Sequence, residues 1–138
     1  MAYVTSTDVI ARVGGTAAAA QLTSESGGTP DADLIDAYIG EATGEVLAAV
    51  AGRTSATITA ADHPNTFALI CGWILAIVVY HIACRRPNAP QSWKDAHDAA
   101  RASLERLVKG ELSLPDASLQ GAASDWGSED QNAASWRG

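Results

Sequence analysis

The chain has 138 residues, of which 47% are hydrophobic and 18% are charged, a balance that excludes an intrinsically disordered protein. Its length allows one domain with a hydrophobic core and is too short for two ordinary domains. The formal charge of −7, with only 9 Lys and Arg residues scattered along the chain, argues against a surface that grips a nucleic-acid backbone. The charge is compatible with an acidic surface that DNA passes without binding.

Two short helices are predicted at the N-terminus. Residues 7–13 follow N-cap residues and precede paired glycines, and residues 16–22 contain a run of alanines. A turn-rich loop separates them from residues 31–50, where acidic residues in the first turn and apolar residues at helical spacing predict a long helix. Gly40 and Gly44 lie four apart in it and leave room for another helix to come close.

Two further long helices are predicted in the second half. After a Thr/Ser/Ala-rich loop, a helix begins near Asp62, expected as its N-cap, with Pro64 in its first turn. The last helix covers residues 91–109, buries a face that includes Leu107 and Val108, and is closed by Gly110. A short extended segment is predicted over residues 111–115. The fold class is therefore all-α, a small bundle of two short and three longer helices.

The domain is expected to cover residues 1–115, followed by a flexible acidic arm over residues 116–138. The arm is rich in Ser, Gly, Ala, Asp and Asn and carries Trp126 and Trp136. In one interpretation these two side chains have no specific role and belong to a disordered tail. The other makes them anchors that dock into an adjacent protein, since Trp is favoured at the centres of interfaces.

Residues 67–84 carry no formal charge and allow two interpretations. As a helix they would be about 27 Å long, at the lower limit for crossing a bilayer, with Arg85 and Arg86 marking a cytoplasmic end. The alternative is a central helix buried by its amphipathic neighbours, which need such a partner in water. We favour the buried helix, and we expect part of its cover to come from another copy of the chain.

The polar side chains predict no catalytic, cofactor-binding or metal-binding site, and we expect the chain not to be an enzyme. Cys71 and Cys84 stand too far apart on one helix for a disulfide and are interpreted as buried thiols of a reducing cytoplasm. His81 and Cys84 have i,i+3 spacing, but a core histidine is the favoured interpretation over a metal ligand. His97 is expected to be solvated. The first residues do not resemble a secretory signal.

Four segments occur in an order typical of a known family. Residues 1–14 combine Tyr3, the segment Thr7-Asp-Val-Ile and a basic residue; Gln21-Leu-Thr, residues 33–53 and residues 107–115 follow. In this order and spacing, over residues 1–115, the chain resembles the small helical head–tail connector proteins of Mu-like phages and related prophages. It departs from their pattern in residues 54–59, where a Tyr and a Pro-Leu are usual, and in the helix that contains residues 67–84, which is more apolar than usual.

The resemblance implies a structural virion protein at the head–tail junction, assembled in the host cytoplasm. Subunits would form a homo-oligomeric ring of about twelve copies beneath the portal protein. The ring would continue the DNA channel without specific binding and offer a surface to the next neck or tail protein. The expected interface residues are Arg53, Thr54, Ile58, Trp93, Trp126 and Trp136. The alternatives are a single-span membrane protein, such as a phage lysis or envelope factor, and a helical regulator unrelated to virions.

Overall fold

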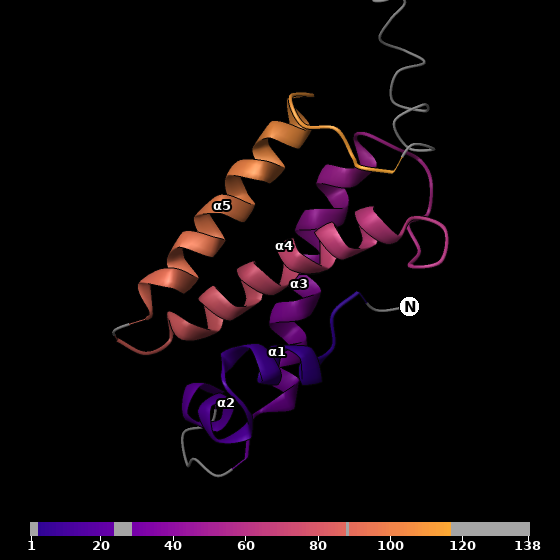
Figure 1. The fold of residues 1–138 in the computed structure, drawn as a ribbon. Helices are drawn as coiled ribbons and strands as arrows, with labels where there is room; N and C mark the ends of the chain where they lie inside the picture. Colours follow the sequence, from indigo (N-terminus) through magenta and orange to yellow (C-terminus); the bar gives the residue numbers. More distant parts are fainter. Residues whose placement is uncertain (1–2, 24–28, 88, 117–138) are drawn as a thin grey trace, which may run out of the picture.

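The computed structural model describes residues 3–23, 29–87 and 89–116, and within them all regular structure is helical. The five helices are α1 (Ser6–Val13), α2 (Thr16–Thr23), α3 (Ala32–Ala51), α4 (Pro64–Ala83) and α5 (Gln91–Val108). In Figure 1, α5 runs beside α4, α3 crosses α4, and α1 and α2 form a compact pair at one end of the molecule. The predicted all-α bundle of two short and three longer helices is confirmed.

Local capping explains where the first helices begin and end. Thr5 and Asp8 form a reciprocal capping box at the start of α1, and the paired glycines after Val13 end it in the left-handed region, with φ of 116° at Gly14 and 110° at Gly15. Asp31 caps α3 by accepting a hydrogen bond from the Leu34 amide at 3.1 Å. These ends lie within two residues of the predicted ones.

The start of α4 differs from the prediction. The N-cap position is His63, whose side chain makes no capping hydrogen bond, so the expected cap at Asp62 is wrong. Pro64 does occupy the first turn. The missing acceptor comes from Asp116, whose carboxylate accepts from the Thr66 amide at 2.7 Å and from the Asn65 side chain at 3.4 Å. The residue that begins the predicted arm is therefore attached to the amino end of α4.

Helix α4 forms the centre of the bundle because α3 and α5 both pack along it, and α1 and α2 contact it as well. The inward-facing residues of α4 pack against the buried apolar faces of the other helices. For α3 this is the face that the apolar spacing predicted. The largest fully buried side chains include Ile35, Ile70, Ile74, Ile77, Ile82 and Leu107. Leu114, in the segment after α5, completes the core. Val108, predicted on the buried face of α5, is instead 61% exposed.

By length and composition α4 is also the helix among the described residues that could cross a membrane. Half of its most apolar window is buried inside the fold. The arginines that follow it have internal partners: Arg85 donates to the Leu22 carbonyl at 2.9 Å, and Arg86 donates to the Gln21 carbonyl at 3.1 Å. Their positive charges offset the negative end of the α2 dipole, where the last helix carbonyls have no partner within the helix. These contacts favour the interpretation of α4 as a core helix.

Candidate functional site

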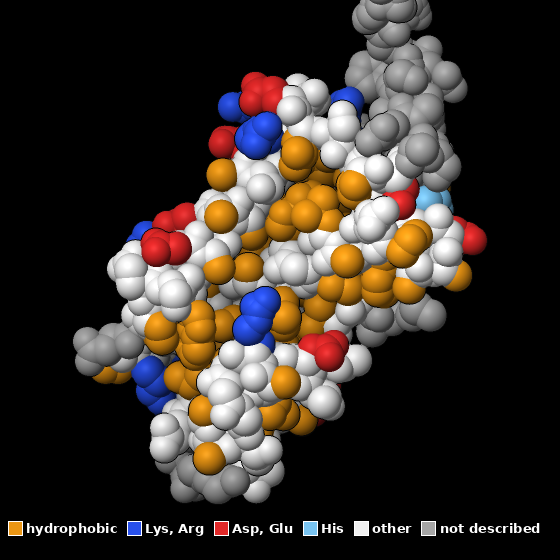
Figure 2. All heavy atoms as spheres, viewed as in Figure 1, with side chains coloured by type: hydrophobic (Ala, Val, Ile, Leu, Met, Phe, Trp, Pro, Cys, Tyr) orange, Lys and Arg blue, Asp and Glu red, His pale blue; other side chains and the backbone are white. Residues whose placement is uncertain are grey.

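An apolar groove runs along the face of α4 that lies between α1 and α5, and we call it the α4 groove. It consists of two adjoining hollows of about 540 and 300 Å³, which share Arg12 and Gly72. Figure 2 shows hydrophobic side chains gathered across this face, with a basic side chain lying over them. The first hollow is lined by Tyr3, Val4, Asp8, Ala11, Arg12, Cys71, Gly72 and Leu75. The second adds Trp73, Ala76, Ala96, Ala99, Ala100 and Ser103.

Small residues are what leave the groove open. A Cβ placed on Gly72 would meet no atom within 4 Å, and the wall contributed by α5 consists mainly of alanines. Gly72 itself is exposed in the middle of α4. A larger residue at these positions would fill the space, so the small residues keep the hollow open.

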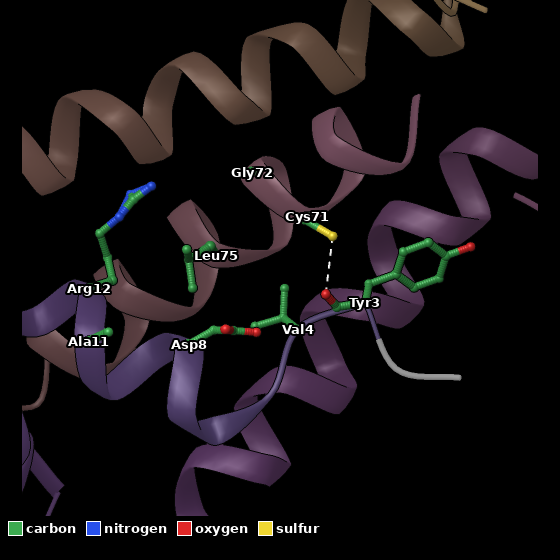
Figure 3. Close-up of a pocket in the computed structure, with 8 residues that line it drawn as sticks. All are labelled: Tyr3, Val4, Asp8, Ala11, Arg12, Cys71, Gly72 and Leu75. Carbon is green, nitrogen blue, oxygen red and sulfur yellow. Dashed lines mark hydrogen bonds between the residues drawn. The ribbon is translucent and has the colours of Figure 1, made fainter. Parts of the chain in front are cut away.

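The polar groups of the groove differ in what they already bind (Figure 3). The Cys71 thiol donates to the Tyr3 carbonyl at 3.0 Å. Asp8 accepts from the Thr5 amide at 2.9 Å as part of the α1 capping box. Arg12 extends from α1 across the groove, and no acceptor or carboxylate partner for it occurs in the described part of the chain. The Arg12 guanidinium therefore lies over an apolar surface and is available to pair with a carboxylate.

The cysteine in the groove is not set up as a nucleophile. Burial, followed by the nearby Asp8 carboxylate, raises the pKa of the Cys71 thiol above its ordinary value. Burial likewise raises the pKa of the Tyr3 hydroxyl. Since the thiolate is the reactive form of cysteine, both groups act as neutral hydrogen-bond donors at pH 7.

A third open hollow lies at the other side of Tyr3, beside the loop between α3 and α4, and we call it the loop hollow. It measures about 460 Å³, and its walls come from the N-terminal segment, the end of α3 and the loop itself. The Tyr3 hydroxyl donates to the Ile58 carbonyl at 3.1 Å, and the Tyr3 ring packs on Phe67 with centroids 4.9 Å apart. Tyr3 therefore holds the loop against α4.

The predicted interface residues fall into three places. Thr54 and Ile58 are both buried and line the loop hollow. The Arg53 guanidinium lies beside Gly110, within 3.6 Å of where a Cβ would stand, which ties the loop to the end of α5. Trp93 is half-buried at the opposite end of α5 and is not part of this group. Trp126 and Trp136 lie outside the described residues.

A cluster of aromatic and histidine rings joins α3, α4 and α5, and sequence reasoning missed it. The rings of His81 and His97 have centroids 5.4 Å apart, and Tyr80 lies 4.5 Å from His97. Arg101 donates to the imidazole of His97 and forms an ion pair with Glu45 of α3 at 3.2 Å. The side chain of His97 is only 15% exposed, so the expectation of a solvated histidine is wrong. The i,i+4 spacing of His97 and Arg101 was the available signal.

The two cysteines also lie differently from the expectation. Cys71 is half-buried, whereas Cys84 is exposed at the end of α4, so the prediction of two buried thiols is wrong for Cys84. Within residues 3–23, 29–87 and 89–116, no three His, Cys, Asp or Glu side chains are grouped as a metal site would require.

Comparison with known proteins identifies the family. No curated protein and no solved structure matches the chain. The profile of the family described as Bacteriophage Mu, Gp36 matches residues 3–131, which is almost the whole chain and includes positions beyond the last described residue. The helices, the α4 groove, the loop hollow and Trp126 are all inside this match. The chain therefore belongs to the bacteriophage Mu Gp36 family and is a Mu-like phage protein.

Proposed function

We propose that the chain is a structural, non-enzymatic virion protein, a head–tail connector subunit that forms a ring beneath the portal and links the capsid to the tail. Membership of a Mu-like phage family supports this role, and so does the arrangement of α4 as a core helix held by four others. The same packing argues against the alternative of a single-span membrane protein. Portal, neighbouring subunits and the next neck or tail protein are the partners this role requires.

The observation that carries the proposal is the loop hollow. It is an apolar surface cavity whose walls include Thr54 and Ile58, and the hydrogen bond from Tyr3 fixes the loop in its open shape. A hollow of this kind has room for a side chain from a neighbouring subunit, which fits the head-to-tail contacts of a closed ring. The net charge of −7 suits a lumen that DNA passes without binding.

Phage assembly in the absence of this protein tests the role. A phage that lacks the gene should accumulate DNA-filled heads and complete tails that do not join, and adding the purified protein to the lysate should restore joined particles. Joined, infectious particles without the protein would contradict the proposal, and so would arrest at an earlier stage that leaves only empty heads.

A pair of loop variants tests the hollow itself. Ala56 is exposed and lines the loop hollow, so Ala56→Arg should block the neighbour without disturbing the core. We expect at least a tenfold loss of joined particles and loss of ring species in native mass spectrometry with the portal. Ala60→Arg is the matched control, because Ala60 is exposed in the same loop and does not line the hollow. Equal behaviour of the two variants would remove the loop hollow from the assembly interface.

A further inference from the structure

The α4 groove offers an apolar surface together with one available cation, and this combination restricts what can occupy it. The occupant has to bring a bulky apolar side chain for the hollow beside Gly72 and a carboxylate for Arg12. A Trp side chain next to acidic residues meets both conditions, since an indole buries about 200 Å² when it is covered.

The chain itself carries such a segment. Trp126 follows Asp125 directly, and Glu129 and Asp130 come shortly after it. The match to the family covers residues 3–131, so it includes Trp126 and ends before Trp136. Of the two tryptophans beyond the described residues, Trp126 is therefore the stronger anchor.

The place where the described chain ends points to the groove. Asn65, Ala68 and Gly72 are exposed at i,i+3 and i,i+7 spacing, so they share one face of α4 that runs from its amino end into the groove. Asp116, the last described residue, is hydrogen-bonded to Asn65 at the start of this face. The chain therefore continues from one end of the surface that needs an occupant.

The distances allow the connection within one molecule. Gly72 lies about 10 Å along α4 from Asn65, at about 1.5 Å per residue. The ten residues from Asp116 to Trp126 span up to about 33 Å when extended. Covering the groove from the same molecule also needs no second copy, so its effective concentration does not depend on that of the protein.

We propose that residues 117–131 fold back along α4 and seat Trp126 in the α4 groove of the same molecule, with the neighbouring carboxylates on Arg12. This assignment is independent of the connector role. It gives the free subunit a cover for the apolar groove between α1, α4 and α5.

The groove contains a natural reporter of this contact. Cys71 lines the first hollow, and the exposed Cys84 is an internal reference at the far end of α4. Alkylation by iodoacetamide, followed site by site with mass spectrometry, measures how well Cys71 is covered in the full-length chain. We expect Trp126→Ala to raise the Cys71 rate about tenfold and Arg12→Glu to raise it by several-fold. Trp136→Ala is the matched control and should leave the rate unchanged.

Each outcome decides the assignment. A constant Cys84 rate and an unchanged far-UV circular dichroism spectrum would attribute faster Cys71 alkylation to the groove and not to unfolding. The same Cys71 rate in the wild type at 1 and 100 µM protein supports cover from within one molecule. Protection of Cys71 that increases with protein concentration would overturn the proposal in favour of a neighbouring copy. An unchanged Cys71 rate in Trp126→Ala, or an equal increase in Trp136→Ala, would also overturn it.

Discussion

Asp116 acts on a helix that begins about fifty residues earlier in the chain. Its carboxylate accepts from the Thr66 amide in the first turn of α4, where four helix amides have no acceptor within the helix. The hydrogen bonds to Thr66 and Asn65 lower the pKa of Asp116 below its ordinary value. This one side chain thereby joins the end of the described chain to the central helix.

Replacing Asp116 tests that role. Asp116→Ala removes the N-terminal cap of α4 and should lower the melting temperature by a few degrees, the usual effect of losing a helix cap in a chain of this size. Because the folded pKa is depressed, the charge stabilises the fold above the ordinary pKa of 3.8 and this contribution disappears as the pH falls through the depressed value. Thermal unfolding from pH 7 down to pH 3 should therefore show the variant and the wild type converging at the acidic end.

The control for this experiment is Asp62→Ala, which changes the residue that sequence alone favoured as the cap. Its side chain is exposed and is not the cap, so it should leave the melting temperature nearly unchanged. A larger effect at Asp62 than at Asp116 would contradict the assignment. Sequence reasoning chose Asp62 because local capping follows a spacing rule, whereas a cap supplied from residue 116 depends on the tertiary fold.

At the scale of single elements, α2 shows how a weak helix is held. Half of its eight residues are alanines, and it is too short to be stable on its own. The fold anchors its end with Arg85 and Arg86, while the Thr23 hydroxyl donates to the Ala19 carbonyl and accepts from the Asp31 amide. The position of α2 is thus fixed by residues of α2 itself and by the turn after α4.

Arg85→Ala should loosen this element selectively. Losing charge-assisted hydrogen bonds to the α2 carbonyls costs about 1 kcal/mol, which corresponds to roughly fivefold faster amide exchange. Hydrogen–deuterium exchange should show this increase in residues 16–23 and little change in α5. Arg106→Ala, on the exposed face of α5, is the comparison variant. Uniform acceleration across all five helices in Arg85→Ala would mean that Arg85 stabilises the whole fold and not α2 alone.

The order and approximate bounds of all five helices followed from caps, glycines and apolar spacing. The pairings between helices did not follow, because the same apolar face can meet several partners. Arg85 and Arg86 illustrate the limit: adjacent to an uncharged stretch they fit the border of a membrane span, and only the fold reveals that they neutralise α2. Thr54 and Ile58 were predicted together, but the hollow that they share also needs Tyr3, which is distant in sequence.

At the scale of the whole molecule, the ring cluster of Tyr38, Tyr80, His81 and His97 connects α3, α4 and α5. Burial, followed by the charges of His97 and Arg101, lowers the pKa of His81 below its ordinary value, and Glu45 and Glu41 partly oppose this shift. As the pH falls, His81 is protonated near pH 6.5 in the unfolded chain and only at a lower pH in the folded chain. Acidification therefore favours the unfolded chain in the window from about pH 7 downwards, until the folded histidine is protonated as well.

We expect the free energy of unfolding to decrease between pH 7 and pH 5, with a smaller decrease in His81→Gln. Urea unfolding followed by circular dichroism at several pH values measures both slopes. If His81→Gln retained the full slope, the pH dependence would have to come from other groups.

Gly72 has a consequence that reaches beyond binding. A glycine inside a helix costs about 1 kcal/mol relative to alanine, and at this position an alanine methyl would collide with nothing. Gly72→Ala should therefore make the protein harder to unfold while narrowing the space above α4. At this position thermal stability favours alanine, whereas an open α4 groove favours glycine. A directed-evolution experiment that selects for heat resistance alone should therefore replace Gly72 early.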